Sequence, residues 1–140
     1  MLLLILLHEE IGRDIAALIE HDWIDTGTRE GRLLDRFLHD FAHDVWPGIN
    51  ELDQHVEEPE DRNFLDSLLF DPPTIDDPAK VANEGIRRMV RNFCVSKINK
   101  IELEIARKQG NVDADLLSLR KSMDELHHLR LNPPAIRQPA

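Results

Sequence analysis

The chain is poor in the residues that build disulfide frameworks and β-sheets. Its 140 residues include one cysteine and no tyrosine, and only 5% are aromatic. A single cysteine excludes an internal disulfide and a cysteine-based zinc site. Because β-branched alternation is sparse and no hairpin turn signal separates the apolar runs, no segment is predicted to be a strand.

Long hydrophobic runs are also scarce, and the one at Met1 to Leu7 resembles the start of a signal peptide. It lacks a preceding basic region, is too short to span a membrane, and is followed by His8-Glu9-Glu10 where small residues should stand. We therefore predict a short buried helix here, no contact with membranes and a cytoplasmic location. A chain that opens directly on an apolar helix is typical of a domain cut from a longer protein.

The net charge of −10 is unevenly divided along the chain. Residues 1–80 carry 20 Asp and Glu against 6 Lys and Arg, whereas residues 81–140 carry 7 against 11. The acidic first part would repel phosphate, which disfavours nucleic acid as a direct partner. The basic last part suits an acidic protein surface or tail, although solvated helical faces would explain both halves equally well.

Apolar residues recur at helical spacing in the first half of the chain. We predict short helices over residues 2–7, from 9 to about 22, from a Thr28 cap to about Val45, over 48–56 and from Pro59 to about 70. Trp23 and Ile24 are expected to fold back over the core. The apolar stripe of the third helix is Leu33, Leu34, Phe37, Leu38, Phe41 and Val45.

A long helix is predicted from the Asp77-Pro78 start to Gln109, where Gly110-Asn111 closes it. Its apolar face changes direction, because two stripes are rotated by about 100–120° from one another. The first comprises Ala82, Ile86, Met89 and Phe93, and the second Cys94, Ile98, Ile101 and Ile105. We expect a bend near Val95-Ser96, where the stripe rotates.

A final helix is predicted to start at an Asp113 cap and to stop at Asn132-Pro133-Pro134. Its narrow stripe is typical of a two-stranded seam and consists of Val112, Leu116, Leu119, Met123 and Leu126. The predicted fold is all-α, with about five short helices and a long helix that continues into a C-terminal antiparallel hairpin. We place a helical bundle at residues 1–94, the hairpin at 95–131 and a disordered tail at 132–140.

No phosphate-loop, dinucleotide, serine-elbow or zinc-protease motif occurs in the sequence. His39 and His43 have metal-ligand spacing, but they fall on the wet side of their helix, where a solvated polar face is the simpler interpretation. Cys94 lies on a buried stripe and behaves there as a small hydrophobe. We expect no catalytic residue, metal or cofactor in this chain.

Two leucines do not fit the seams of their helices. Leu103 lies about 170° from the centre of its stripe and Leu117 about 140° from its own. Exposed leucines are common, but these two fall near the tip of the projecting hairpin. With Arg107, Gln109 and Lys121 they are the predicted partner-binding residues, of the kind that a helix-in-groove or helix-bundle contact would use.

The sequence resembles the C-terminal helicase-binding domain of bacterial DnaG-type primases. The leucine-rich opening from Leu3 to Glu10, the stretch from Arg88 to Gly110 and the closing segment from Leu116 to Leu129 carry the resemblance, in patterning more than in sharp motifs. In that family a helical bundle carries a helical hairpin that docks on the N-terminal collar of the replicative DnaB-type helicase.

The resemblance implies a non-catalytic module that recruits primer synthesis to the replication fork. The parent chain would be a DNA primase, a nucleotidyltransferase that acts as a DNA-directed RNA polymerase. The implied partners are the helicase N-terminal domain and the acidic tail of single-strand DNA-binding protein. Two alternatives stay open: the helicase N-terminal collar domain itself, which shares the fold, and an unrelated metal-binding or catalytic bundle that uses His39 and His43.

Overall fold

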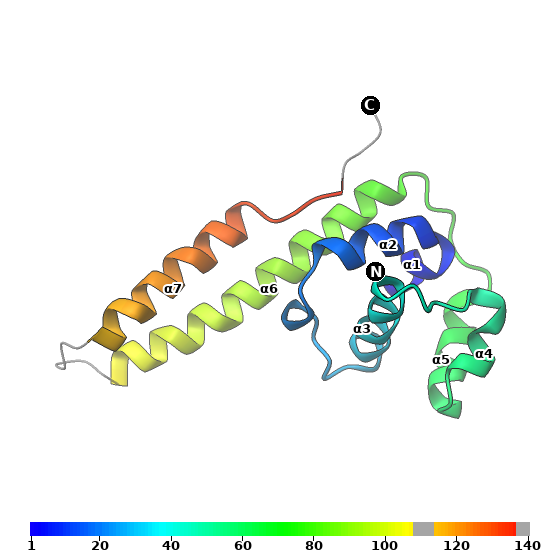
Figure 1. Ribbon diagram of the computed structural model, residues 1–140, viewed down its shortest axis with the longest axis horizontal. Helices are drawn as coiled ribbons and strands as arrows, with labels where there is room; N and C mark the ends of the chain where they lie inside the picture. The colour runs from blue at the N-terminus through cyan, green and yellow to red at the C-terminus, as the bar shows by residue number, and fades with distance from the viewer. Residues whose placement is uncertain (108–113, 137–140) are drawn as a thin grey trace.

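A computed structural model describes residues 1–107 and 114–136 as helices joined by short connections (Figure 1). The elements are α1 (Leu2–Leu7), α2 (Glu9–Leu18), the 3-10 turn η1 (His21–Trp23), α3 (Arg29–Ala42), the 3-10 turn η2 (Ile49–Glu51), α4 (Leu52–His55), α5 (Pro59–Leu69), α6 (Pro78–Arg107) and α7 (Ala114–Leu131). No strand occurs among the described residues, so the predicted all-α class is confirmed. The short helices form a head, from which α6 runs outward and pairs with α7 as an antiparallel hairpin (Figure 1).

The core of the head lies where α1 meets α2, α3 and the first half of α6. Four of the six residues of α1 are buried, and the Phe37 ring on α3 is fully enclosed. The helices α2 and α3 approach closely at Gly12, where an added Cβ would lie 2.8 Å from the Phe41 ring. Glycine at this position therefore sets the distance between the two helices.

Three of the sequence signals for helix starts are confirmed. The Thr28 hydroxyl accepts a hydrogen bond from the Gly31 amide at 3.0 Å, which caps α3. Pro59 occupies the first turn of α5, and the Asp77 carboxylate caps α6 by accepting from the Lys80 amide at 3.1 Å. These side chains satisfy backbone donors that a helix start leaves without partners.

The predicted end of α3 was wrong. The helix ends at Ala42, and Val45, which we placed on the inner stripe, is 58% exposed. Asp44 adopts a left-handed backbone conformation with φ 56°, which ends the helical path. Trp46 then turns back, stacks on Phe41 at 4.9 Å between ring centroids and donates from Nε1 to Glu9 at 3.1 Å.

The buried face of α6 is one continuous ridge rather than two separate stripes. Val90, which neither predicted stripe contained, is fully buried and lies between Ile86 and Cys94. The ridge residues Ala82, Ile86, Val90, Cys94 and Ile98 follow one another at every fourth position. Each four-residue step rotates the face by about 40°, so the helix changes packing partner gradually. The helix is continuous through Val95 and Ser96, and the bend expected there stays a prediction.

The segment that follows α7 differs from the predicted disordered tail in its first part. Ile136 is 7% exposed and packs against the core. The Asn83 side chain on α6 holds its backbone on both sides: Oδ1 accepts from the Ile136 amide at 2.7 Å, and Nδ2 donates to the Ile136 carbonyl oxygen at 3.1 Å. Residues 137–140 lie outside the described residues, as do the predicted Gly110-Asn111 turn and Asp113 cap.

None of the helices described here combines the length and apolar character that crossing a bilayer requires.

Candidate functional site: the hairpin and the grooves at its root

The hairpin seam is only partly closed. On α6, Ile98 is buried, but Ile101 and Ile105 are half-buried. On α7 no residue from Leu116 to Leu131 is buried, and the seam positions there are intermediate: Leu116, Leu119, Met123, Leu126 and Leu129. Two helices cannot enclose side chains on both flanks of their contact, so this seam leaves apolar surface for a further element.

The predicted partner-binding residues lie on the outside of the hairpin. Leu103 is 62% and Leu117 71% exposed, and Arg107 and Lys121 are exposed as well. Neither cation forms an ion pair with another described residue. Leu103 and Arg107 are four residues apart on α6, as are Leu117 and Lys121 on α7, so each helix presents one leucine with one cation on the same face. Gln109 lies outside the described residues.

A groove, here called the arginine groove, lies between α6 and the end of α7. It has a volume of about 540 Å³ and is lined by Glu84, Arg87, Arg88, Arg91, Arg130, Leu131 and Pro133. Its four guanidinium groups have no acidic partner within the described part of the chain, although the protein as a whole is acidic. Leu131 beside them is 80% exposed. Such a surface attracts carboxylate or phosphate groups.

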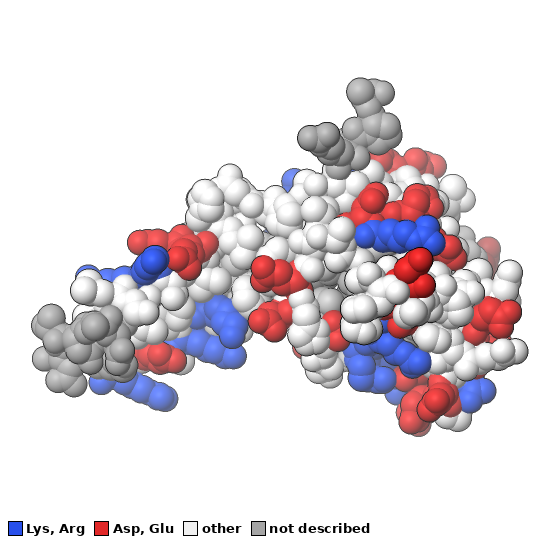
Figure 2. All heavy atoms as spheres, in the orientation of Figure 1, with Lys and Arg blue, Asp and Glu red and all other residues white. Residues whose placement is uncertain are grey.

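A second groove, here called the junction groove, lies where the hairpin leaves the head. Trp23 of η1 forms one wall, and residues of α6 and α7 form the others over a volume of about 420 Å³. Figure 2 shows uncharged side chains over the root of α7 and acidic ones across much of the head. Neither groove was predicted from the sequence, because each depends on how segments distant in the chain meet. The spacing of Arg87, Arg88 and Arg91 was the one sequence feature that indicated the arginine groove.

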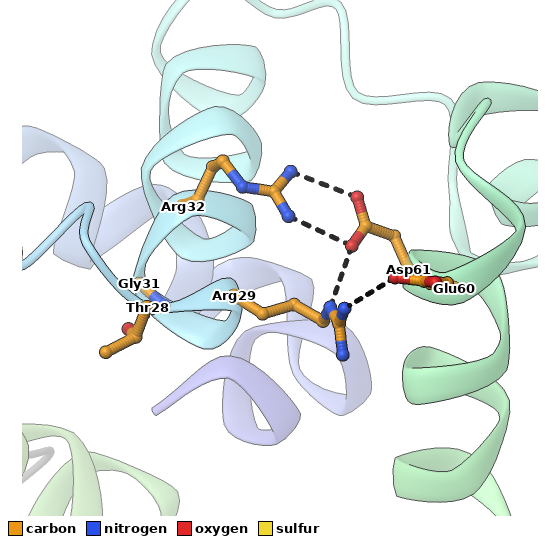
Figure 3. A network of polar contacts seen from close by, with 6 residues as sticks. All are labelled: Thr28, Arg29, Gly31, Arg32, Glu60 and Asp61. Carbon is orange, nitrogen blue, oxygen red and sulfur yellow. Dashed lines mark hydrogen bonds and ion pairs between the residues drawn. The ribbon is translucent and has the colours of Figure 1, made fainter.

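Helix α5 is fixed to the head by an ionic network (Figure 3). The Asp61 carboxylate, 3% exposed, accepts two hydrogen bonds from Arg32 at 3.0 Å and one from Arg29 at 3.1 Å. Arg29 also donates to Glu60 at 3.0 Å. The hydrogen bond from Arg32 lowers the pKa of Asp61, although burial acts in the opposite direction. This network positions α5 and lies apart from both grooves at the hairpin root.

The residues considered for metal or covalent chemistry are not assembled into such a site. His39 and His43 are exposed, their ring centroids lie 4.1 Å apart, and the Nδ1 of His43 hydrogen-bonds the His39 carbonyl oxygen at 2.9 Å. In the described residues, no three His, Cys, Asp or Glu side chains gather around a position for a metal ion. Cys94 is fully buried, and burial raises the pKa of its thiol, which makes it a poor nucleophile.

The described surface therefore offers recognition features: outward leucines on a hairpin, an arginine groove and an apolar junction groove. Comparison of the chain with models of protein families, with curated proteins and with solved structures finds no match.

Proposed function

We propose that this chain is a non-catalytic interaction module of a bacterial DnaG-type primase and that it binds the replicative DnaB-type helicase. The observation that carries the proposal is the projecting hairpin, whose outer sides expose Leu103 and Leu117 and whose seam remains partly open. The resemblance along nearly the whole sequence adds to it. The module would hold primer synthesis at the replication fork.

Burial of the exposed leucines near the hairpin tip would favour binding of a partner there. Full burial of an aliphatic side chain contributes about 1.5–3 kcal/mol, so two exposed leucines supply a useful part of a binding energy. Arg107 lies one helical turn from Leu103 and Lys121 one turn from Leu117, so each exposed leucine has a cation beside it. An apolar groove on an acidic partner surface would complement either leucine with its cation.

Titration calorimetry with the intact cognate helicase tests the proposal. The double variant Leu103→Glu/Leu117→Glu should weaken binding at least about tenfold, because it places two charges in an apolar contact. The control Val45→Glu/Phe70→Glu makes the same chemical change at two exposed positions of the head and should stay within about twofold.

A deletion variant replaces residues 101–121 with a short glycine-containing turn, which removes the hairpin tip but keeps its root. If this shortened chain still binds the helicase with unchanged affinity, the hairpin tip is not the contact. Light scattering of the isolated chain addresses the other interpretation, since assembly into a ring would favour a helicase collar domain instead.

The arginine groove supports a second partner, the acidic tail of single-strand DNA-binding protein. Unpaired arginines beside the exposed Leu131 suit a segment that carries carboxylates next to apolar side chains. Fluorescence anisotropy with that tail as a labelled peptide should show binding that weakens steeply with salt. Arg87→Glu/Arg91→Glu should abolish it, whereas Arg107→Glu/Lys121→Glu, an equal charge change at the tip, should not.

A further inference from the structure

We infer that the junction groove binds one amphipathic helix of the helicase. The apolar side chains of that helix would contact both the head and the hairpin. The inference rests on the proposed function and names a second contact, separate from the tip leucines. The groove joins segments distant in sequence: η1 of the head, the middle of α6 and the last turns of α7. A ligand here touches both the head and the hairpin.

The groove wall is apolar and incompletely covered. Trp23, Phe93, Ile101, Leu126 and Leu129 line it, and all but Trp23 keep part of their surface exposed. Two of these side chains, Ile101 and Leu126, belong to the predicted hairpin seam, yet the two helices alone leave them partly exposed. Completing such a wall with a further apolar face recovers about 25 cal/mol for each Å² removed from water.

The shape of the groove favours a helix over a small ligand. Its wall extends from Phe93 to Ile101 on α6 and from Ser122 to Leu129 on α7. Each stretch spans about two helical turns, or roughly 10–12 Å. A third helix lying along two paired helices presents side chains one turn apart to both, as in helical bundles.

Charged residues at the rim of the groove indicate which charges the docked helix should carry. Glu20 and Glu125 stand at the groove, and so does Lys97, whose Nζ lies 5.9 Å from the centroid of the Phe93 ring. An apolar stripe flanked by a basic residue on one side and an acidic residue on the other would complement this rim.

The free chain also leaves a polar group of the wall unsatisfied. The Nε1 of Trp23 is buried and has no hydrogen-bond acceptor among the described residues. An unsatisfied buried donor costs about 1–3 kcal/mol. A small shift of the three-residue turn η1 upon docking would let an oxygen of the arriving helix accept this hydrogen bond, which lowers the free energy of the bound state.

Charge reversal on α7 provides the first test, with the intact chain and the intact cognate helicase in calorimetry. Glu125→Lys should weaken binding by about fivefold or more, because it opposes the basic flank of the docked helix. Asp124→Lys is the matched control: it is the neighbouring exposed residue, carries the same charge change and does not line the groove. Asp124→Lys should change affinity by less than about twofold, and equal losses in both variants would overturn the inference.

Hydrogen exchange of the same complex provides the second test. Backbone amides of η1 and of residues 122–129 should become more protected when the helicase binds, while η2 and α4 should not change. If the helicase binds but η1 exchanges as in the free chain, the junction groove is not a contact and the proposed function still stands. If the helicase does not bind the unmodified chain at all, the proposed function fails and this inference fails with it.

Discussion

At the scale of single residues, Asp61 is the most deeply buried charged side chain of the described chain. Its carboxylate is almost fully removed from solvent, yet it stays charged because Arg32 and Arg29 supply three hydrogen bonds. A buried ion pair with good hydrogen-bond geometry adds little to the free energy of unfolding. Removing one partner lowers that free energy strongly, because the other charge stays buried without a partner. Since Asp61 is the one buried charge of α5, it sets where that helix sits against α3.

Replacing Asp61 with Asn should destabilise the protein by about 1–3 kcal/mol, the usual cost of losing hydrogen bonds to charged groups. The two arginines are partly exposed, so water can take over some of their solvation. Asp66→Asn, on the same helix but exposed, should change stability by less than about 0.5 kcal/mol. Urea denaturation followed by circular dichroism measures both. Equal effects of the two substitutions would show that the network does not hold α5.

The same carboxylate predicts a pH dependence. The pKa of Asp61 is lower in the folded chain than its ordinary value, mainly because of the hydrogen bond from Arg32. A depressed carboxyl pKa adds stability above the unfolded pKa, and this stability is lost as the pH falls through the folded value. Between about pH 5 and pH 3, the unmodified protein should therefore lose more stability than Asp61→Asn. Parallel urea curves at both pH values test this, and identical losses would contradict the assignment.

At the scale of elements, the return of the chain after α7 depends on one amide side chain. Asn83 forms both of its hydrogen bonds with the backbone of Ile136, as a strand neighbour would. This contact ties the end of the hairpin to the first half of α6. Pro133, three residues before Ile136, borders the arginine groove.

Asn83→Ala should release the segment 133–136 from α6. The loss of two hydrogen bonds with partial exposure of Ile136 should cost about 1–2 kcal/mol. Amide exchange of Ile136 should accelerate while the α1 amides stay protected. Asn99→Ala is the control, because Asn99 is exposed on the same helix. If Ile136 keeps its protection in Asn83→Ala, apolar packing alone holds this segment.

At the scale of the whole molecule, capping and proline signals within one helical turn predicted several helix starts. Contacts between residues far apart in the sequence determine the end of α3 and the two grooves. Thr28, Pro59 and Asp77 each marked a helix start through chemistry confined to one turn. The end of α3 could not be read in this way, because Trp46 reaches back to Glu9 across 37 residues. The junction groove likewise needs η1 to lie beside α6, and the arginine groove needs the register of α7. No periodicity in the sequence encodes either arrangement.

The division into head and hairpin predicts two levels of stability in one chain. The buried residues of the head come from several helices, so the head amides should open only when the whole domain unfolds. Helix α7 has no buried residue between Leu116 and Leu131, so its detachment from α6 loses less packing than the opening of a head helix does. Native-state amide exchange at low denaturant should therefore show α7 opening at a lower free energy than α1 and α3. The helicase, bound as proposed, should raise the opening free energy of α7 and that of the global unfolding which exposes α1 and α3 by the same RT ln(1 + [L]/Kd), about 2.7 kcal/mol at a hundredfold excess over Kd. A single common opening energy for α1, α3 and α7 would mean that the hairpin is an inseparable part of the head.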